Sequence, residues 1–283
     1  MEIRQRLRMG AWLLMITTLP AGAHPFDPFA QEKQAELQSV VEYLRQGNTH
    51  EALIQTDQAI AKFPKHGPFY TLKAQILLKL GQTRAAQSAV EHALTLAPEY
   101  ALSYWIRGLI HQQRNNPSAA IENFNQVLKL EDENPALMAQ ALGSRGMALA
   151  DLGRHAEALE DLNRALEVRP TAFAERQFRA VVYLALDRLP EAESDITLLF
   201  AREPDNALVH RLQANLWLKR RQPKHALNAL NQSLAIDPKD AQAYRLRARA
   251  HKELGQAAAH LADLAKACEL GDVASCNKGT SKN

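Results

Sequence analysis

Apolar residues recur along the chain in pairs of segments, each about 14 residues long and spaced like one face of an amphipathic helix. The segments TLKAQILLKL (71–80) and AAQSAVEHALTL (85–96) form one such pair, separated by a glycine-containing turn and closed by Pro98. Residues three and four apart lie on one face of a helix, so this spacing predicts two helices. The pattern predicts an all-α chain of helical hairpins.

The hairpins repeat with a fixed period. GRHAEALEDLNRALEVRP (153–170) and GQTRAAQSAVEHALTLAP (81–98) carry glycine, small, apolar and proline residues at the same offsets. Prolines at 64, 98, 170, 204 and 238 are separated by 34, 72, 34 and 34 residues, and 72 is two periods plus four residues inserted near 132–135. Such a period predicts a repeat protein. The expected repeats are 33–66, 67–100, 101–138, 139–172, 173–206, 207–240 and 241–270, after a linker at 24–32 and before a capping segment and tail at 271–283.

Small residues at fixed positions predict close packing of the two helices in each hairpin. Glycines at 47, 81, 153 and 255 are expected to end the first helix in a left-handed conformation, and the prolines to stop the second helix. A lone hairpin would leave its apolar face exposed to water, so stacking of the hairpins is required. The small positions are Ala74, Gly108, Gly146, Ala180, Ala214 and Ala248 on the first helices, and Ala86, Ala120, Ala158, Ala192 and Ala226 on the second.

This pattern resembles the tetratricopeptide repeat family over residues 33 to about 270. Local departures are Asp132 in place of a closing proline and His260 at a small-residue position. The resemblance implies a right-handed α-α superhelical solenoid of about seven hairpins with a short C-terminal capping helix. It also implies a concave groove, lined by the first helices, that binds a protein or peptide partner.

The resemblance assigns a set of inward positions to the groove wall. The first three repeats make it apolar and the last two make it basic, which would suit an extended or helical peptide with an apolar segment followed by acidic residues. Alternatively, the basic positions are a solvated helix face and Trp105 is a core residue. The predicted peptide-binding residues are Leu37, Val41, Leu44, Gln75, Leu78, Leu102, Trp105, Leu109, Arg211, Asn215, Lys219, Arg245, Arg249 and Lys252.

The N-terminus has the pattern of a secretory signal peptide. Three arginines precede an apolar run from Met9 to Leu19, and Ala21 and Ala23 form a small-x-small exit. The run is too short to span a bilayer, which takes about 20 apolar residues. We expect a signal peptide at 1–23, cleavage after Ala23, and a periplasmic or secreted protein without a transmembrane segment after cleavage.

Two cysteines lie eight residues apart near the C-terminus. On one continuous helix Cys268 and Cys276 would be too far apart to pair, but Gly271 and Asp272 between them favour a helix stop and a helix start. In an oxidising compartment this favours a disulfide between the last repeat and a capping helix. The alternative is two buried free thiols. The spacing is also similar to the cysteine pair of Sel1-like repeats.

The charge balance and the motif search argue against nucleic-acid binding and catalysis. Of 34 basic and 31 acidic residues, the first ten positions hold three and one, which leaves 31 against 30 and no electrostatic signature of nucleic-acid binding. We find no motif for catalysis, a cofactor or a metal site, and expect a noncatalytic scaffold. Two alternatives are a metal-binding or enzymatic protein using His24 as mature N-terminus, and attachment to anionic lipid or polysaccharide through the stripe at 245–252.

Overall fold

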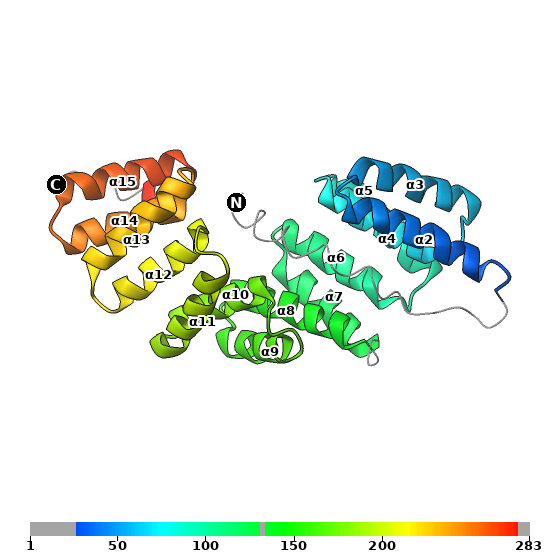
Figure 1. Ribbon diagram of the computed structural model, residues 1–283, viewed down its shortest axis with the longest axis horizontal. Helices are drawn as coiled ribbons and strands as arrows, with labels where there is room; N and C mark the ends of the chain where they lie inside the picture. Colours follow the sequence, from blue (N-terminus) through cyan, green and yellow to red (C-terminus); the bar gives the residue numbers. More distant parts are fainter. Residues whose placement is uncertain (1–26, 131–133, 277–283) are drawn as a thin grey trace. The chain divides into compact units, whose positions relative to one another are not determined.

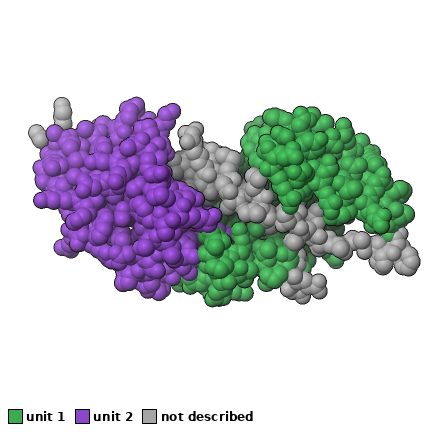
Figure 2. All heavy atoms as spheres, viewed as in Figure 1, with its two compact units in different colours: residues 1–172 green, residues 173–283 purple. Residues whose placement is uncertain are grey.

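A computed structural model describes residues 27–130 and 134–276, which form 15 helices and no strand. The helices are arranged as seven consecutive hairpins followed by a four-residue helix (Figure 1). The predictions of an all-α chain, tandem helical hairpins and a short final helix are therefore confirmed. The chain divides into two compact units, residues 1–172 and 173–283 (Figure 2).

Unit 1 contains four hairpins, and the second helix of each of the first three packs on the first helix of the hairpin that follows. The first helices also contact one another, α4 with α6 and α6 with α8. The hairpins are α2 (Ala30–Arg45) with α3 (Thr49–Lys62), α4 (Gly67–Lys79) with α5 (Thr83–Leu96), α6 (Ala101–Gln113) with α7 (Pro117–Leu130), and α8 (Pro135–Asp151) with α9 (His155–Val168).

Unit 2 has the same arrangement with three hairpins and a cap. Its first helices are again neighbours, α10 with α12 and α12 with α14, and α16 packs on α15. The elements are α10 (Phe173–Ala185) with α11 (Leu189–Arg202), α12 (Ala207–Lys219) with α13 (Pro223–Ile236), α14 (Ala241–Glu253) with α15 (Ala257–Glu269), and α16 (Val273–Cys276).

The close packing of each hairpin depends on its small residues. A Cβ added at Gly108 of α6 would lie 2.5 Å from the Phe124 ring of α7, and one at Gly146 of α8 would lie 2.9 Å from Leu162 of α9. No real Cβ is found so close to a neighbour, so these glycines let the two helices approach. The predicted small positions Ala74, Ala86, Ala120, Ala158, Ala180, Ala192, Ala214, Ala226 and Ala248 are all fully buried.

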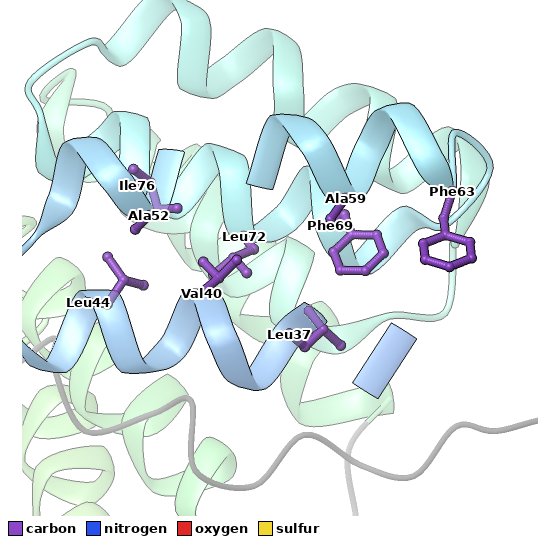
Figure 3. Close-up of a cluster of buried hydrophobic side chains, with 9 residues drawn as sticks. All are labelled: Leu37, Val40, Leu44, Ala52, Ala59, Phe63, Phe69, Leu72 and Ile76. Carbon is purple, nitrogen blue, oxygen red and sulfur yellow. The ribbon is translucent and has the colours of Figure 1, made fainter. Parts of the chain in front are cut away.

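In the first two hairpins, large apolar side chains fill the space between the helices. Leu37, Val40 and Leu44 of α2 point into a cluster with α3 and α4 (Figure 3). Burial of such side chains supplies most of the stability of stacked hairpins. The partners are Ala52, Ala59 and Phe63 from α3 and its end, and Phe69, Leu72 and Ile76 from α4.

The four-residue insertion lengthens a helix. α8 begins at Pro135, four residues before the repeat boundary expected at 139, and has 17 residues where α4 and α6 have 13. Asn134 caps it, since its side chain accepts a hydrogen bond from the Leu137 N–H at 3.1 Å. At the N-terminus α2 likewise begins at Ala30, inside the linker expected at 24–32.

Every hairpin turn contains one residue in the left-handed region, confirming the prediction for the four glycines. At Arg221 the Arg221 N–H bonds to the Leu218 carbonyl and the Gln222 N–H to the Trp217 carbonyl, the pattern of a Schellman motif. Three turns reach this conformation without glycine, which the sequence did not predict. The seven residues are Gly47, Gly81, Asn115, Gly153, Asp187, Arg221 and Gly255.

Arg221→Gly is expected to stabilise unit 2. Arg221 has φ of 58°, which costs an L side chain about 1 kcal/mol. Glycine removes that cost, and part of the gain is offset because a glycine loses more backbone entropy on folding. The free energy of unfolding, measured with urea, should rise by about 0.5 kcal/mol. As a control, Gly153→Ala, at φ of 75°, should lower it by about 1 kcal/mol. A loss of stability in Arg221→Gly would contradict the expectation.

Candidate peptide-binding surface

The candidate surface is formed by equivalent positions on successive first helices. The 34-residue period places residues 37, 71 and 105 at one such position in unit 1, and residues 177, 211 and 245 at the same position in unit 2. Because neighbouring first helices are in contact within each unit, these positions form columns of adjacent side chains. The predicted binding residues belong to these columns and to those one and two turns further along, except Leu102, which lies one turn before Trp105.

Seven of the eight predicted positions in the first three repeats are buried in the structure. Leu37 and Leu44 belong to the core cluster with α3 and α4, which corrects their assignment to an open groove wall (Figure 3). Both faces of these helices carry apolar residues, so the inward and core sides could not be separated by spacing alone. The buried residues are Leu37, Val41, Leu44, Gln75, Leu78, Trp105 and Leu109, and Leu102 is partly exposed.

Trp105 lies inside unit 1 and bridges two first helices. Its side chain is 4% exposed, and its Nε1–H donates to the Ser144 hydroxyl of α8 at 3.3 Å. A neighbouring bridge joins Thr71 of α4 to Ser103 of α6, whose hydroxyls are 2.7 Å apart. A buried, hydrogen-bonded indole agrees with the alternative that Trp105 is a core residue of the stack, and its role in peptide binding stays a prediction.

Arg211, the first of the basic groove residues predicted in the last two repeats, is also buried. Its guanidinium donates to Asp240 at 3.1 Å and to Gln242 at 2.7 Å, both at the start of α14. Burial lowers the pKa of Arg211, while the Asp240 carboxylate acts in the opposite direction. Asp240 in turn caps α14 by accepting from the N–H groups of Gln242 and Ala243. Arg211 therefore joins consecutive hairpins.

The other basic positions stay accessible, but most have a carboxylate partner. Lys219 pairs with Asp187 at 2.7 Å, Arg249 with Glu253 at 3.0 Å, and Arg245 lies 3.6 Å from Asp272. Exposed pairs of this kind contribute little energy but they neutralise charge locally. Lys252 is exposed and has no ion pair within residues 27–130 and 134–276. The stripe is thus a mixed-charge surface, and attachment to anionic surfaces stays a prediction.

In unit 2 one column of the surface changes character from helix to helix. Val181 on α10, Asn215 on α12 and Arg249 on α14 occupy the same repeat position. Val181 is 44% exposed, Asn215 is partly exposed and the Arg249 side chain is 49% exposed. Three adjacent helices thus present an apolar group, an amide and a cation in that order.

A recurring ion pair inside the hairpins escaped the sequence analysis. In three hairpins an arginine of the first helix makes two hydrogen bonds to an aspartate sixteen residues later, on the second helix. In the third hairpin Arg107 donates in the same way to Asn123 at 2.6 Å. These groups hold the two helices of a hairpin together and lie away from the column described above. The three pairs are Arg145–Asp161, Arg179–Asp195 and Arg247–Asp263.

The predicted cleavage site and the predicted metal-binding N-terminus lie in a part of the chain that the structure does not describe. Ala23 and His24, the expected cleavage site and metal-binding N-terminus, lie outside the described residues. Within residues 27–130 and 134–276, no three His, Cys, Asp or Glu side chains are grouped as metal ligands. No helix in that part of the chain is long and apolar enough to cross a bilayer.

Comparison with known proteins identifies the repeats. The tetratricopeptide repeat family model matches residues 71–135 and 107–174. Human DnaJ homolog subfamily C member 7 is 25% identical over 191 residues, which are 62% of this chain and 38% of that protein. The chain thus spans less than half of that relative's length. The predicted tetratricopeptide repeats are confirmed within residues 71–174, and the likeness of the cysteine pair to Sel1-like repeats stays a prediction.

Solved structures of tetratricopeptide repeat proteins share the fold of this chain. A tetratricopeptide repeat protein from Parabacteroides merdae superposes with a TM-score of 0.63 at 19% identity, over 88% of this chain and 96% of that chain. YrrB, a TPR protein with an unusual peptide-binding site, has a TM-score of 0.53 at 21% identity, over 66% of this chain and 95% of its own. At these identities the likeness concerns the fold alone.

Proposed function

Since this chain carries tetratricopeptide repeats, we propose that it is a noncatalytic scaffold of the bacterial envelope that binds a peptide segment of another envelope protein. Chains built from these repeats bind protein or peptide partners through the extended surface that the stacked first helices present. The observation that carries the proposal is the accessible column Val181, Asn215 and Arg249, one residue from each first helix of unit 2.

The chemistry of this column selects the peptide. A segment lying across α10, α12 and α14 would meet an apolar side chain, then an amide that can hydrogen-bond to a peptide group, then a cation. Lys252, one turn beyond Arg249, adds an exposed positive charge on α14. The bound segment is therefore extended or helical, with an apolar residue near α10 and an acidic residue or terminal carboxylate near α14.

The location is proposed from two features of the chain. The arginine-rich start, short apolar run and Ala21-x-Ala23 exit are typical of a signal peptide cleaved after Ala23. The disulfide between Cys268 and Cys276 supports the same location, because disulfides persist in oxidising compartments such as the periplasm. Fractionation of the producing cells should yield a periplasmic protein, and its intact mass should be that of a chain that starts at His24. A cytoplasmic protein with its first 23 residues intact would contradict the location.

The partner can be sought by crosslinking in cells followed by mass spectrometry. We expect a specific crosslinked protein whose yield falls about tenfold in Arg249→Glu, because the variant places a carboxylate where the partner's acidic group binds. Lys224→Glu is the matched control: it makes the same kind of charge reversal at an exposed position of α13, away from the first helices. Equal loss in both variants, or in neither, would contradict binding on this surface.

A further inference from the structure

The last hairpin exposes a position that earlier hairpins cover. Leu261 of α15 occupies the same repeat position as Ile121 of α7 and Leu227 of α13. Ile121 is 9% exposed, and Leu227 packs against the core shared by α13 and α14. Leu261 is 50% exposed. In the six earlier hairpins this position is buried or partly buried, and it is apolar in four of them; the other two carry Gln87 and Glu193.

The cap reproduces only the start of a next hairpin. Arg245 lies 3.6 Å from Asp272, as Arg211 bonds to Asp240 one repeat earlier. Cys276 of α16 is bonded to Cys268, which occupies the position of the buried Leu234. The described residues of α16 pack on α15 and are bonded to its C-terminal end at Cys268, whereas the middle of α15 is exposed.

The open part of α15 is apolar at positions where the preceding second helix, α13, is polar. Beside Leu261 it exposes three alanines, at positions where α13 exposes Lys224, Asn228 and Asn231. Val273 of α16 is 74% exposed. The stripe at i, i+3, i+4 and i+7 consists of Ala258, Leu261, Ala262 and Ala265.

The first helix of the first hairpin, α2, differs from α15 in the polarity of its exposed face. The exposed face of α2 is polar, with Gln31, Gln34, Gln38 and Glu42 along it. Terminal repeats of stacked proteins need a polar outer face for solubility. The first hairpin meets this requirement, whereas the last one presents an apolar helix face, which is typical of an interface.

We propose that two copies of this chain associate through α15, with the two helices antiparallel across a two-fold axis near Leu261 and Ala262. The stripe is self-complementary, since Leu261 of each copy can pack on the alanines of the other, and closed two-fold pairs are the commonest oligomers. No charged side chain lies in the stripe: Asp263 is turned inward onto Arg247, and Lys266 pairs with Glu269 at its edge. A head-to-tail contact would instead place the polar α2 face on α15.

Sedimentation velocity of the full chain, from low to high micromolar concentration, tests the proposal. We expect a dimer in fast exchange with monomer. Leu261→Lys should raise the dissociation constant about 100-fold, since the dimer loses two buried leucine side chains at about tenfold each. The control is Ile54→Lys, which changes an equally exposed apolar residue on α3 and should leave the dimer unchanged. Thermal melts of both variants should match that of the parent chain.

A disulfide crosslink tests whether α15 of one chain contacts α15 of the second chain. Ala262→Cys should form an interchain disulfide under mild oxidation, whereas Asn228→Cys, at the same repeat position of α13, should stay monomeric on a non-reducing gel. The cysteines already in the described chain are bonded to each other and do not interfere. A chain that stays monomeric at every concentration, or a dimer unaffected by Leu261→Lys, would overturn the proposal.

Discussion

Replacing Asp161 with alanine is expected to lower the free energy of unfolding by about 3 kcal/mol. The carboxylate is 3% exposed, and Arg145 donates to its two oxygens from Nε and Nη2, both at 2.7 Å. This contact raises the pKa of Arg145 above its usual range. Removing the carboxylate leaves a half-buried guanidinium without its partner between α8 and α9. Urea unfolding followed by circular dichroism measures the loss.

The chain itself supplies the matched control for this variant. In the sixth hairpin the two equivalent positions are Gln213 and Ala229, so an amide facing alanine is an alternative that this fold accepts. The double variant Arg145→Gln, Asp161→Ala copies that pair and should recover at least half of the stability lost in Asp161→Ala. Glu157→Ala, which removes an exposed pair with Arg154, should leave the free energy of unfolding close to that of the parent chain. Equal losses in Asp161→Ala and the double variant would show that the alanine, and not the unpaired arginine, is responsible.

The repeat architecture could be predicted because each hairpin obeys the same rules independently. The period of the prolines, the small residues and the glycines all agree on one fold, and residues such as Gly108 and Ala158 lie where that fold requires them. The hairpin ion pairs were equally visible, since arginine and aspartate recur sixteen residues apart. They were missed because the apolar spacing alone was used to define the repeat.

The binding surface could be predicted less well. Leu37 and Leu44 satisfy both the spacing of a core helix and that of a groove wall, and only the positions of α3 and α4 decide between them. The basic stripe looked cationic in the sequence because its partners Asp187 and Asp272 come from other hairpins or the cap. Long-range pairing of this kind leaves no local signal. The left-handed turn at Arg221 was missed because glycine is the expected residue there.

Cys276→Ser is expected to lower the stability of the C-terminal end of unit 2 by about 2.5 kcal/mol. The disulfide joins residues eight apart, with Cα atoms separated by 4.8 Å, and it is the covalent link that holds the four-residue helix α16 on α15. Helices this short are not stable by themselves, because forming the first turn fixes several residues for one hydrogen bond. Without the link α16 should detach, and hydrogen exchange should become fast at residues 272–276.

The same experiment in reductant separates the covalent link from the side chain. The parent chain treated with dithiothreitol should melt like untreated Cys276→Ser, and reductant should have no effect on the variant. Arg245→Gln removes the described ion pair to the cap, which is half-exposed with its atoms 3.6 Å apart, and should cost less than about 0.5 kcal/mol. A parent chain whose cap stays protected from exchange after reduction would contradict this account, since packing alone would then hold α16. Release of the cap in reductant would mean that the end of the repeat array is complete only in an oxidising compartment, as the proposed periplasmic location requires.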